Sequence, residues 1–111
     1  MSERTRPRGP ARHELPAIDD LAMVAARHAD HALAASRDRD SARWVAFFEP
    51  LPDKLRDEDL KGLRAAAVRV RAAYGPKDSI RDALPQTVTE PLLEAIDRLL
   101  RELNREAARR S

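Results

Sequence analysis

A chain of 111 residues, of which 42% are hydrophobic, is long enough for one domain with a packed core and too short for two. It contains no cysteine, which excludes disulfide bonds, thiolate nucleophiles and zinc–thiolate clusters. The 21 Lys and Arg residues nearly balance the 19 Asp and Glu residues, and the formal net charge is only +2.

The excess positive charge belongs to residues 1–14. Four arginines stand there against Glu3 and Glu14, an excess of two that accounts for the whole net charge. The segment has two prolines, one glycine and few apolar side chains, so we predict a flexible basic arm. A solvated terminus is the favoured interpretation. The alternative is a tail that contacts nucleic-acid phosphates through its arginines, which are Arg4, Arg6, Arg8 and Arg12.

Arginine outnumbers lysine heavily, since the only lysines are Lys54, Lys61 and Lys77. Together with the abundant alanine, this indicates the codon bias of a high-GC genome, as in a high-GC bacterium. The sequence pI near 9.5 is therefore weaker evidence for nucleic-acid binding than it would otherwise be.

No long apolar run is present, and the N-terminus has no apolar core of the kind that a signal peptide carries. We therefore expect a cytoplasmic protein that does not associate with a membrane.

A first helix is predicted over residues 16–36, with Pro16 in its first turn and acids at its positive end. Its apolar stripe is mostly alanine, which would let a partner helix approach closely. His28 and His31 lie three residues apart on this helix. Two imidazoles without further donors do not make a metal site, so we interpret them as a boundary residue and a surface residue.

The only tryptophan and both phenylalanines fall in a second predicted helix, residues 41–49, which Pro50 ends. Trp44, Phe47 and Phe48 have the spacing i, i+3 and i+4, so their rings leave one helix face. We interpret this cluster as core. The alternative is an exposed docking or base-stacking surface.

Residues 51–56 are predicted to form a bend or a single turn before a third helix over residues 57–74. Gly62 is interpreted there as the place of a close helix contact with the alanine stripe. A basic edge follows the apolar face and could receive phosphates, although a charged border is normal for an amphipathic helix. The residues of this edge are Lys61, Arg64 and Arg71.

A short helix over residues 78–84 and a long last helix from residue 89 or 90 to about 109 complete the chain, with Pro91 in the first turn. The apolar arc of the last helix is wide, so part of it either faces a second subunit or covers the chain's own core. We hold these alternatives about equal. The candidate dimer interface is Leu93, Leu100, Leu103 and Ala107.

The sequence therefore predicts an all-α fold, a small compact bundle of three longer and two short helices over residues 15–111. No phosphate-binding glycine loop or nucleophile elbow occurs, and no cofactor, metal or catalytic residue is expected. The favoured hypothesis is a non-enzymatic interaction or regulatory domain, homodimeric or bound to another protein. A nucleic-acid-binding accessory protein and a small helical enzyme are the alternatives.

Overall fold

The chain folds into helices and turns throughout the residues that the computed structural model describes, 11–76 and 78–110. The helices are the 3-10 turn η1 (Arg12–Glu14), α1 (Pro16–Asp38), α2 (Ala42–Phe48), α3 (Leu51–Asp57), α4 (Leu60–Ala72), α5 (Ile80–Ala83) and α6 (Gln86–Arg110). No strand occurs among these residues. The predicted all-α bundle is confirmed.

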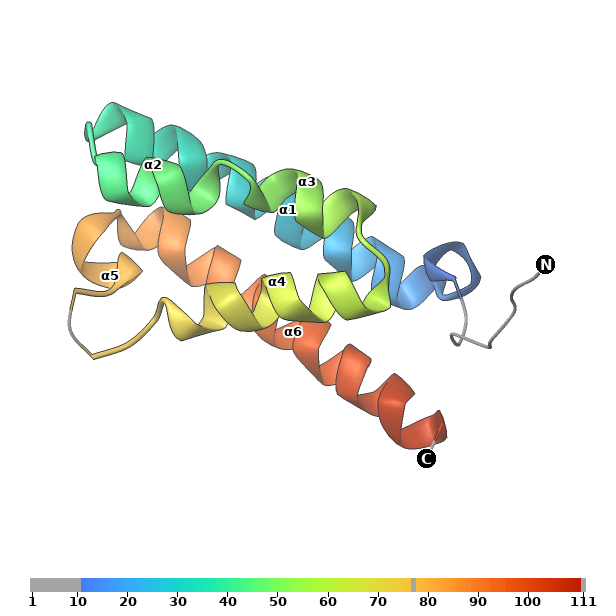
Figure 1. The fold of residues 1–111 in the computed structure, drawn as a ribbon. Helices are drawn as coiled ribbons and strands as arrows, with labels where there is room; N and C mark the ends of the chain where they lie inside the picture. The colour runs from blue at the N-terminus through green and yellow to red at the C-terminus, as the bar shows by residue number, and fades with distance from the viewer. Residues whose placement is uncertain (1–10, 77, 111) are drawn as a thin grey trace.

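The two longest helices, α1 and α6, pack along each other and form the centre of the bundle. Figure 1 shows α2 and α3 in succession along α1, with α4 lying across α6. The C-terminal half of α6 extends past α4, and η1 lies at the start of α1 (Figure 1). The face that carries α2, α3 and α4 is therefore made of three successive segments of the chain.

The core consists of alanines from α1 and larger side chains from the helices around it. The larger buried side chains include Trp44, Phe48, Leu63, Val70, Tyr74, Leu92, Ile96 and Leu99, whereas Phe47 and Leu60 are half-buried. The alanine face of α1 was predicted to pack against the third predicted helix, which corresponds to α4. It packs instead mainly against α6 and α3, because their leucines fill the space that small side chains leave.

Among the helix boundaries that differ from the prediction, two involve a proline near the start of a helix. Leu51–Asp57 is a two-turn helix, in which Pro52 occupies the first turn and Leu51 and Leu55 are buried. The last helix begins at Gln86, so Pro91 lies inside it and not in its first turn. Pro91 has no backbone N–H to donate to the Thr87 carbonyl, and buried Thr89 and Leu92 hold this segment against the core.

Gly62 has a different role from the one predicted. A Cβ atom at this position would lie 2.9 Å from the Cβ of Glu58, in the turn that precedes α4. The backbone N–H of Gly62 donates to the Asp59 side chain, which caps the helix. The glycine therefore leaves room for the Glu58 side chain at the start of α4, and the predicted close contact with α1 is wrong.

Candidate functional site

Helix α2 places the three aromatic rings between the core and the surface. The Ser41 hydroxyl accepts a hydrogen bond from the Trp44 backbone N–H and so defines where the helix begins. Phe48 is fully buried and Trp44 is 5% exposed, whereas Phe47 is half-buried. Phe47 meets both neighbouring rings edge to face, with centroids 5.3 Å from Trp44 and 5.0 Å from Phe48. The predicted core cluster thus extends to the surface through Phe47.

An open groove of about 490 Å³ lies where this cluster meets the C-terminal end of α4. That volume falls in the range of ordinary binding pockets, roughly 300–1,000 Å³. The groove is lined by Arg43, Trp44, Ala46 and Phe47 from α2, by Arg69 and Ala72 from α4, and by Ala73 directly after α4. The alanine side chains leave the space, and the phenyl ring of Phe47 and the indole ring of Trp44 supply apolar surface.

Two arginines of the groove are held against its aromatic rings. The Arg43 Cζ atom lies 4.7 Å from the centre of the Trp44 ring, and the Arg69 Cζ atom lies 5.2 Å from the centre of the Phe47 ring. Neither arginine forms an ion pair with an acidic side chain of residues 11–76 or 78–110. The groove therefore offers two cations that keep their charge available to an occupant.

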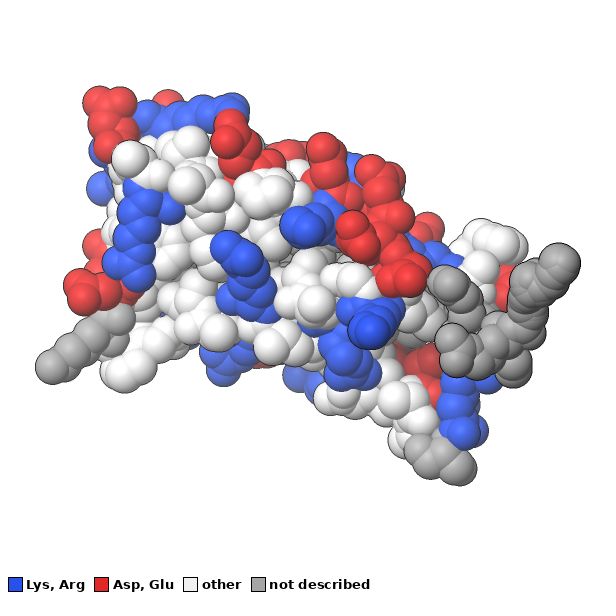
Figure 2. Space-filling view, viewed as in Figure 1, with Lys and Arg blue, Asp and Glu red and all other residues white. Residues whose placement is uncertain are grey.

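Charge is unevenly distributed over the face that carries the groove. Figure 2 shows uncharged surface across α2 and α4, interrupted by basic side chains. Acidic side chains gather over α3 and its connection to α4, and others lie at the left end of the view, beside the start of α2 and α5. The acids over α3 and that connection are Asp53, Asp57, Glu58 and Asp59, all exposed. An anionic group approaching this face is repelled at the α3 end and attracted at the groove.

Helix α4 carries an apolar stripe next to the groove, and the rest of the described chain leaves this stripe exposed. Ala65, Val68 and Ala72 follow one another at intervals of three and four residues, and all three are exposed. Val68 is 50% exposed, which makes it one of two large hydrophobic side chains on the surface of the described residues. The other is Met23, 44% exposed on α1. Residues with this spacing share one helix face, so the stripe continues the groove lining along α4.

The structure describes only some of the predicted nucleic-acid contacts. Arg4, Arg6 and Arg8 lie outside the described residues. Arg12 belongs to η1, where its guanidinium lies 2.9 Å from Asp19 and donates to the Glu58 carbonyl, and its side chain is only 10% exposed. Arg12 thus fastens the start of the fold to α1 and to the α3–α4 connection. Arg12 is held by these contacts, and its contact with phosphates stays a prediction.

The basic edge of α4 is also partly occupied by contacts within the chain. Arg64 donates to the Asn104 side chain at 2.7 Å, and Arg71 lies 3.0 Å from Asp97. Lys61 is exposed. Of the three predicted residues, two therefore connect α4 to α6.

The candidate dimer interface is narrower than the sequence indicated. Leu103 is only 4% exposed and belongs to the intramolecular core. Leu93 and Leu100 are half-buried and pack against that core, and Ala107 is exposed. These three residues are spaced by seven and so share one face of α6.

The two histidines lie on α1 with ring centres 5.9 Å apart. His28 is half-buried and His31 is exposed, as predicted. Burial lowers the pKa of His28, and the neighbouring His31 and Arg27 lower it further. Within the described parts of the chain, no three His, Cys, Asp or Glu side chains are arranged so that they could hold a metal ion.

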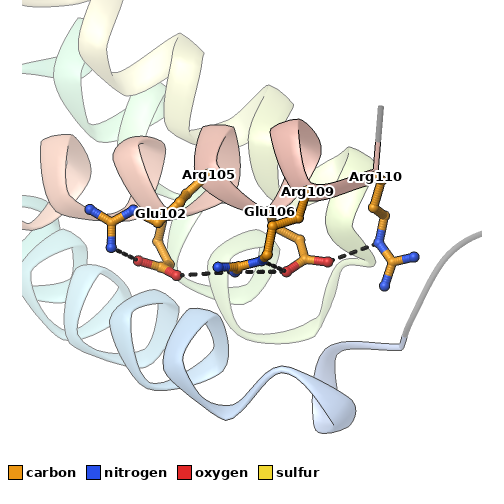
Figure 3. A network of polar contacts seen from close by, with 5 residues as sticks. All are labelled: Glu102, Arg105, Glu106, Arg109 and Arg110. Carbon is orange, nitrogen blue, oxygen red and sulfur yellow. Dashed lines mark hydrogen bonds and ion pairs between the residues drawn. The ribbon is translucent and has the colours of Figure 1, made fainter.

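A second polar cluster, at the end of α6, is satisfied by its own ion pairs. Figure 3 shows Glu102 and Glu106 among arginines of the last turns of the helix. Arg109 and Arg110 donate to the two carboxylate oxygens of Glu106 at 2.9 and 2.8 Å, and Arg105 donates to Glu102 at 3.2 Å. The Arg109 hydrogen bond lowers the pKa of Glu106. Because each carboxylate is paired, this cluster stabilises the helix end.

No known protein family, curated protein or solved structure matches this chain. Among the described residues, no helix combines the length and apolar character needed to cross a membrane. The groove between α2 and α4 is therefore the candidate site on its own geometry. Sequence reasoning missed Arg43 and Arg69. For Arg43, the one signal in the sequence was its position directly before Trp44. For Arg69 there was no such signal, because it contacts Phe47, which lies 22 residues away in the sequence.

Proposed function

We propose that this chain is a non-enzymatic protein-interaction domain whose binding surface is the groove between α2 and α4. The observation that carries the proposal is the pair of arginines, Arg43 and Arg69, held over aromatic rings at the groove without acidic partners in the described chain. Aromatic and arginine side chains at a concave site are typical of protein interfaces, where they provide much of the binding energy.

The same geometry favours a protein over a nucleic acid as the partner. Base stacking needs a free ring face, but Trp44 is 5% exposed and Arg43 and Arg69 lie over the rings of the groove. The acids over α3 would in addition repel a phosphate backbone that crossed this face. Binding through Arg4, Arg6 and Arg8 stays an alternative, and salt-sensitive gel shifts that depend on those three residues would support it.

Site-specific photo-crosslinking in the cells that make the protein tests the proposal. A photoreactive amino acid replaces exposed Ala72 in the groove or, as the control, exposed Ala17 near the opposite end of the bundle. We expect a discrete protein adduct from position 72 and not from position 17. Equal adducts from both positions, no adduct from position 72, or an adduct that nuclease destroys would refute the proposal.

A homodimer through α6 is the second candidate, supported by the seven-residue spacing of Leu93, Leu100 and Ala107. Light scattering after size exclusion distinguishes the 12.5 kDa monomer from a dimer of twice that mass. A dimer that Leu100→Glu dissociates without loss of helicity would support this interface. A monomeric mass at micromolar concentration would end it.

A further inference from the structure

Resting on the proposed function, we infer that the partner of the α2–α4 groove is an acidic amphipathic helix that lies along α4. It inserts one large apolar side chain into the groove and places carboxylates against Arg43 and Arg69. Three independent features of the site lead to this partner chemistry.

The first feature is the backbone of the groove walls. The residues that line the groove come from α2, from α4 and from Ala73 directly after α4, so helices and not strands border it. A strand cannot add to such a wall, because strand addition needs an unpaired sheet edge. A helix that binds in a groove needs no sheet edge, because it presents its apolar side chains to the groove.

The second feature is the apolar stripe of Ala65, Val68 and Ala72. Its three- and four-residue spacing matches the spacing of apolar positions on an amphipathic helix that packs against it. Two of the three side chains are alanine, so a partner helix can approach α4 closely. The stripe leads to Ala72, which also lines the groove, so one partner helix can cover both.

The third feature is charge. Arg43 and Arg69 come from α2 and α4 and line the same groove, so carboxylates on a helix that lies there can meet both. Each stays over an aromatic ring, which limits the side-chain freedom that binding would otherwise remove. The acids over α3 discourage an acidic partner from extending along that helix. A basic segment has no anion to meet in the groove, which makes the chain's own N-terminal arm an unsuitable occupant.

Charge reversal tests the inference on the crosslinking variant at position 72. The double substitution Arg43→Glu with Arg69→Glu is compared with Arg27→Glu with Arg39→Glu, which reverses two exposed arginines outside the groove lining. We expect the groove pair to lower the adduct yield at least about tenfold, which corresponds to about 1.4 kcal/mol, and the control pair to change it little. Circular dichroism of both double variants verifies that each retains its helices.

Val68 provides an independent variant with a matched control. Val68→Glu places an acid in the path of an acidic helix, whereas Val68→Lys removes the same apolar surface and adds a favourable charge. The adduct should therefore decrease more with Glu than with Lys. Met23→Glu, at the other exposed hydrophobic position of the described chain, should leave the adduct unchanged.

Mass spectrometry of the crosslinked segment completes the test. The expected segment carries net negative charge and apolar residues with helical spacing. A basic or uncharged segment, equal effects of the two double variants, or a greater loss with Val68→Lys than with Val68→Glu would overturn the inference. In each of these cases, an adduct that forms from position 72 and not from position 17 would still support the proposed function. If positions 72 and 17 give equal adducts in the protein without further substitutions, both the proposed function and this inference are refuted.

Discussion

Phe48 and Phe47 are adjacent in the sequence, yet the structure predicts that they affect stability very differently. Phe48 is fully buried, and its replacement by alanine leaves an enclosed cavity. Such a change costs about 3–5 kcal/mol. Phe47 is half-buried and lines the groove, so Phe47→Ala opens space to solvent and loses one contact with Arg69. We expect a cost of about 1–2 kcal/mol, from partial burial and the lost cation–π contact.

Urea unfolding followed by circular dichroism at 222 nm measures both losses under one set of conditions. A domain of this size has a total stability of about 5–15 kcal/mol, so Phe48→Ala consumes a large share of it. With a slope of about 1.5 kcal/mol per molar urea, its midpoint should fall by roughly 2–3 M. The same protein concentration is used throughout, because dimerisation would add to the apparent stability. Equal losses for the two variants, or a smaller loss for Phe48→Ala, would refute the division of the aromatic cluster into core and groove.

Three further predictions concern a helix cap and two titratable groups. Asp59→Ala removes the side-chain cap of α4 and should lower the free energy of unfolding by about 0.5–2 kcal/mol in the same urea assay. Asp59→Asn should lower it less, and Asp57→Ala, at an exposed position, serves as the control. Burial raises the pKa of Tyr74, whose hydroxyl donates to the Thr89 carbonyl at 2.6 Å. Because the unfolded tyrosine loses its proton near pH 10, stability should fall above that pH, and Tyr74→Phe should remove this fall. The pKa of His28 is lowered in the folded protein, so the unfolded chain binds a proton there more readily, and stability should decrease as the pH falls below about 6.5. The decrease should be less steep in His28→Gln. If His28→Gln leaves the pH dependence of stability unchanged, His28 is not its cause.

Local signals in the sequence predicted most helices correctly. Ser41 before the aromatic segment and Pro50 after it define α2 through a hydrogen bond and a steric clash that involve only neighbouring residues. The same kind of reasoning failed at Pro52 and Pro91, because proline occurs both at helix ends and within the first turns. Burial of Leu51 and Leu55 against the core decided in favour of helix α3.

The candidate site was only half visible in the sequence. The density of aromatic residues in α2 could be recognised, but not that Phe48 lies in the core while Phe47 lines a groove. The predicted basic residues were less informative. A formal charge says nothing about whether an acid elsewhere in the chain neutralises it, and Arg12 and Arg71 are paired in this way.

By itself, the sequence determined that this protein is helical, where its strongest caps and breaks lie, and which faces are apolar. These properties depend on residues within a few positions of one another, since helix hydrogen bonds and side-chain spacing are local. Only the tertiary structure decided that α1 packs along α6, that Leu103 belongs to the core, and that Arg43 and Arg69 line one groove. Such outcomes depend on how distant segments fill space together, and the spacing of residues along the chain does not contain that information.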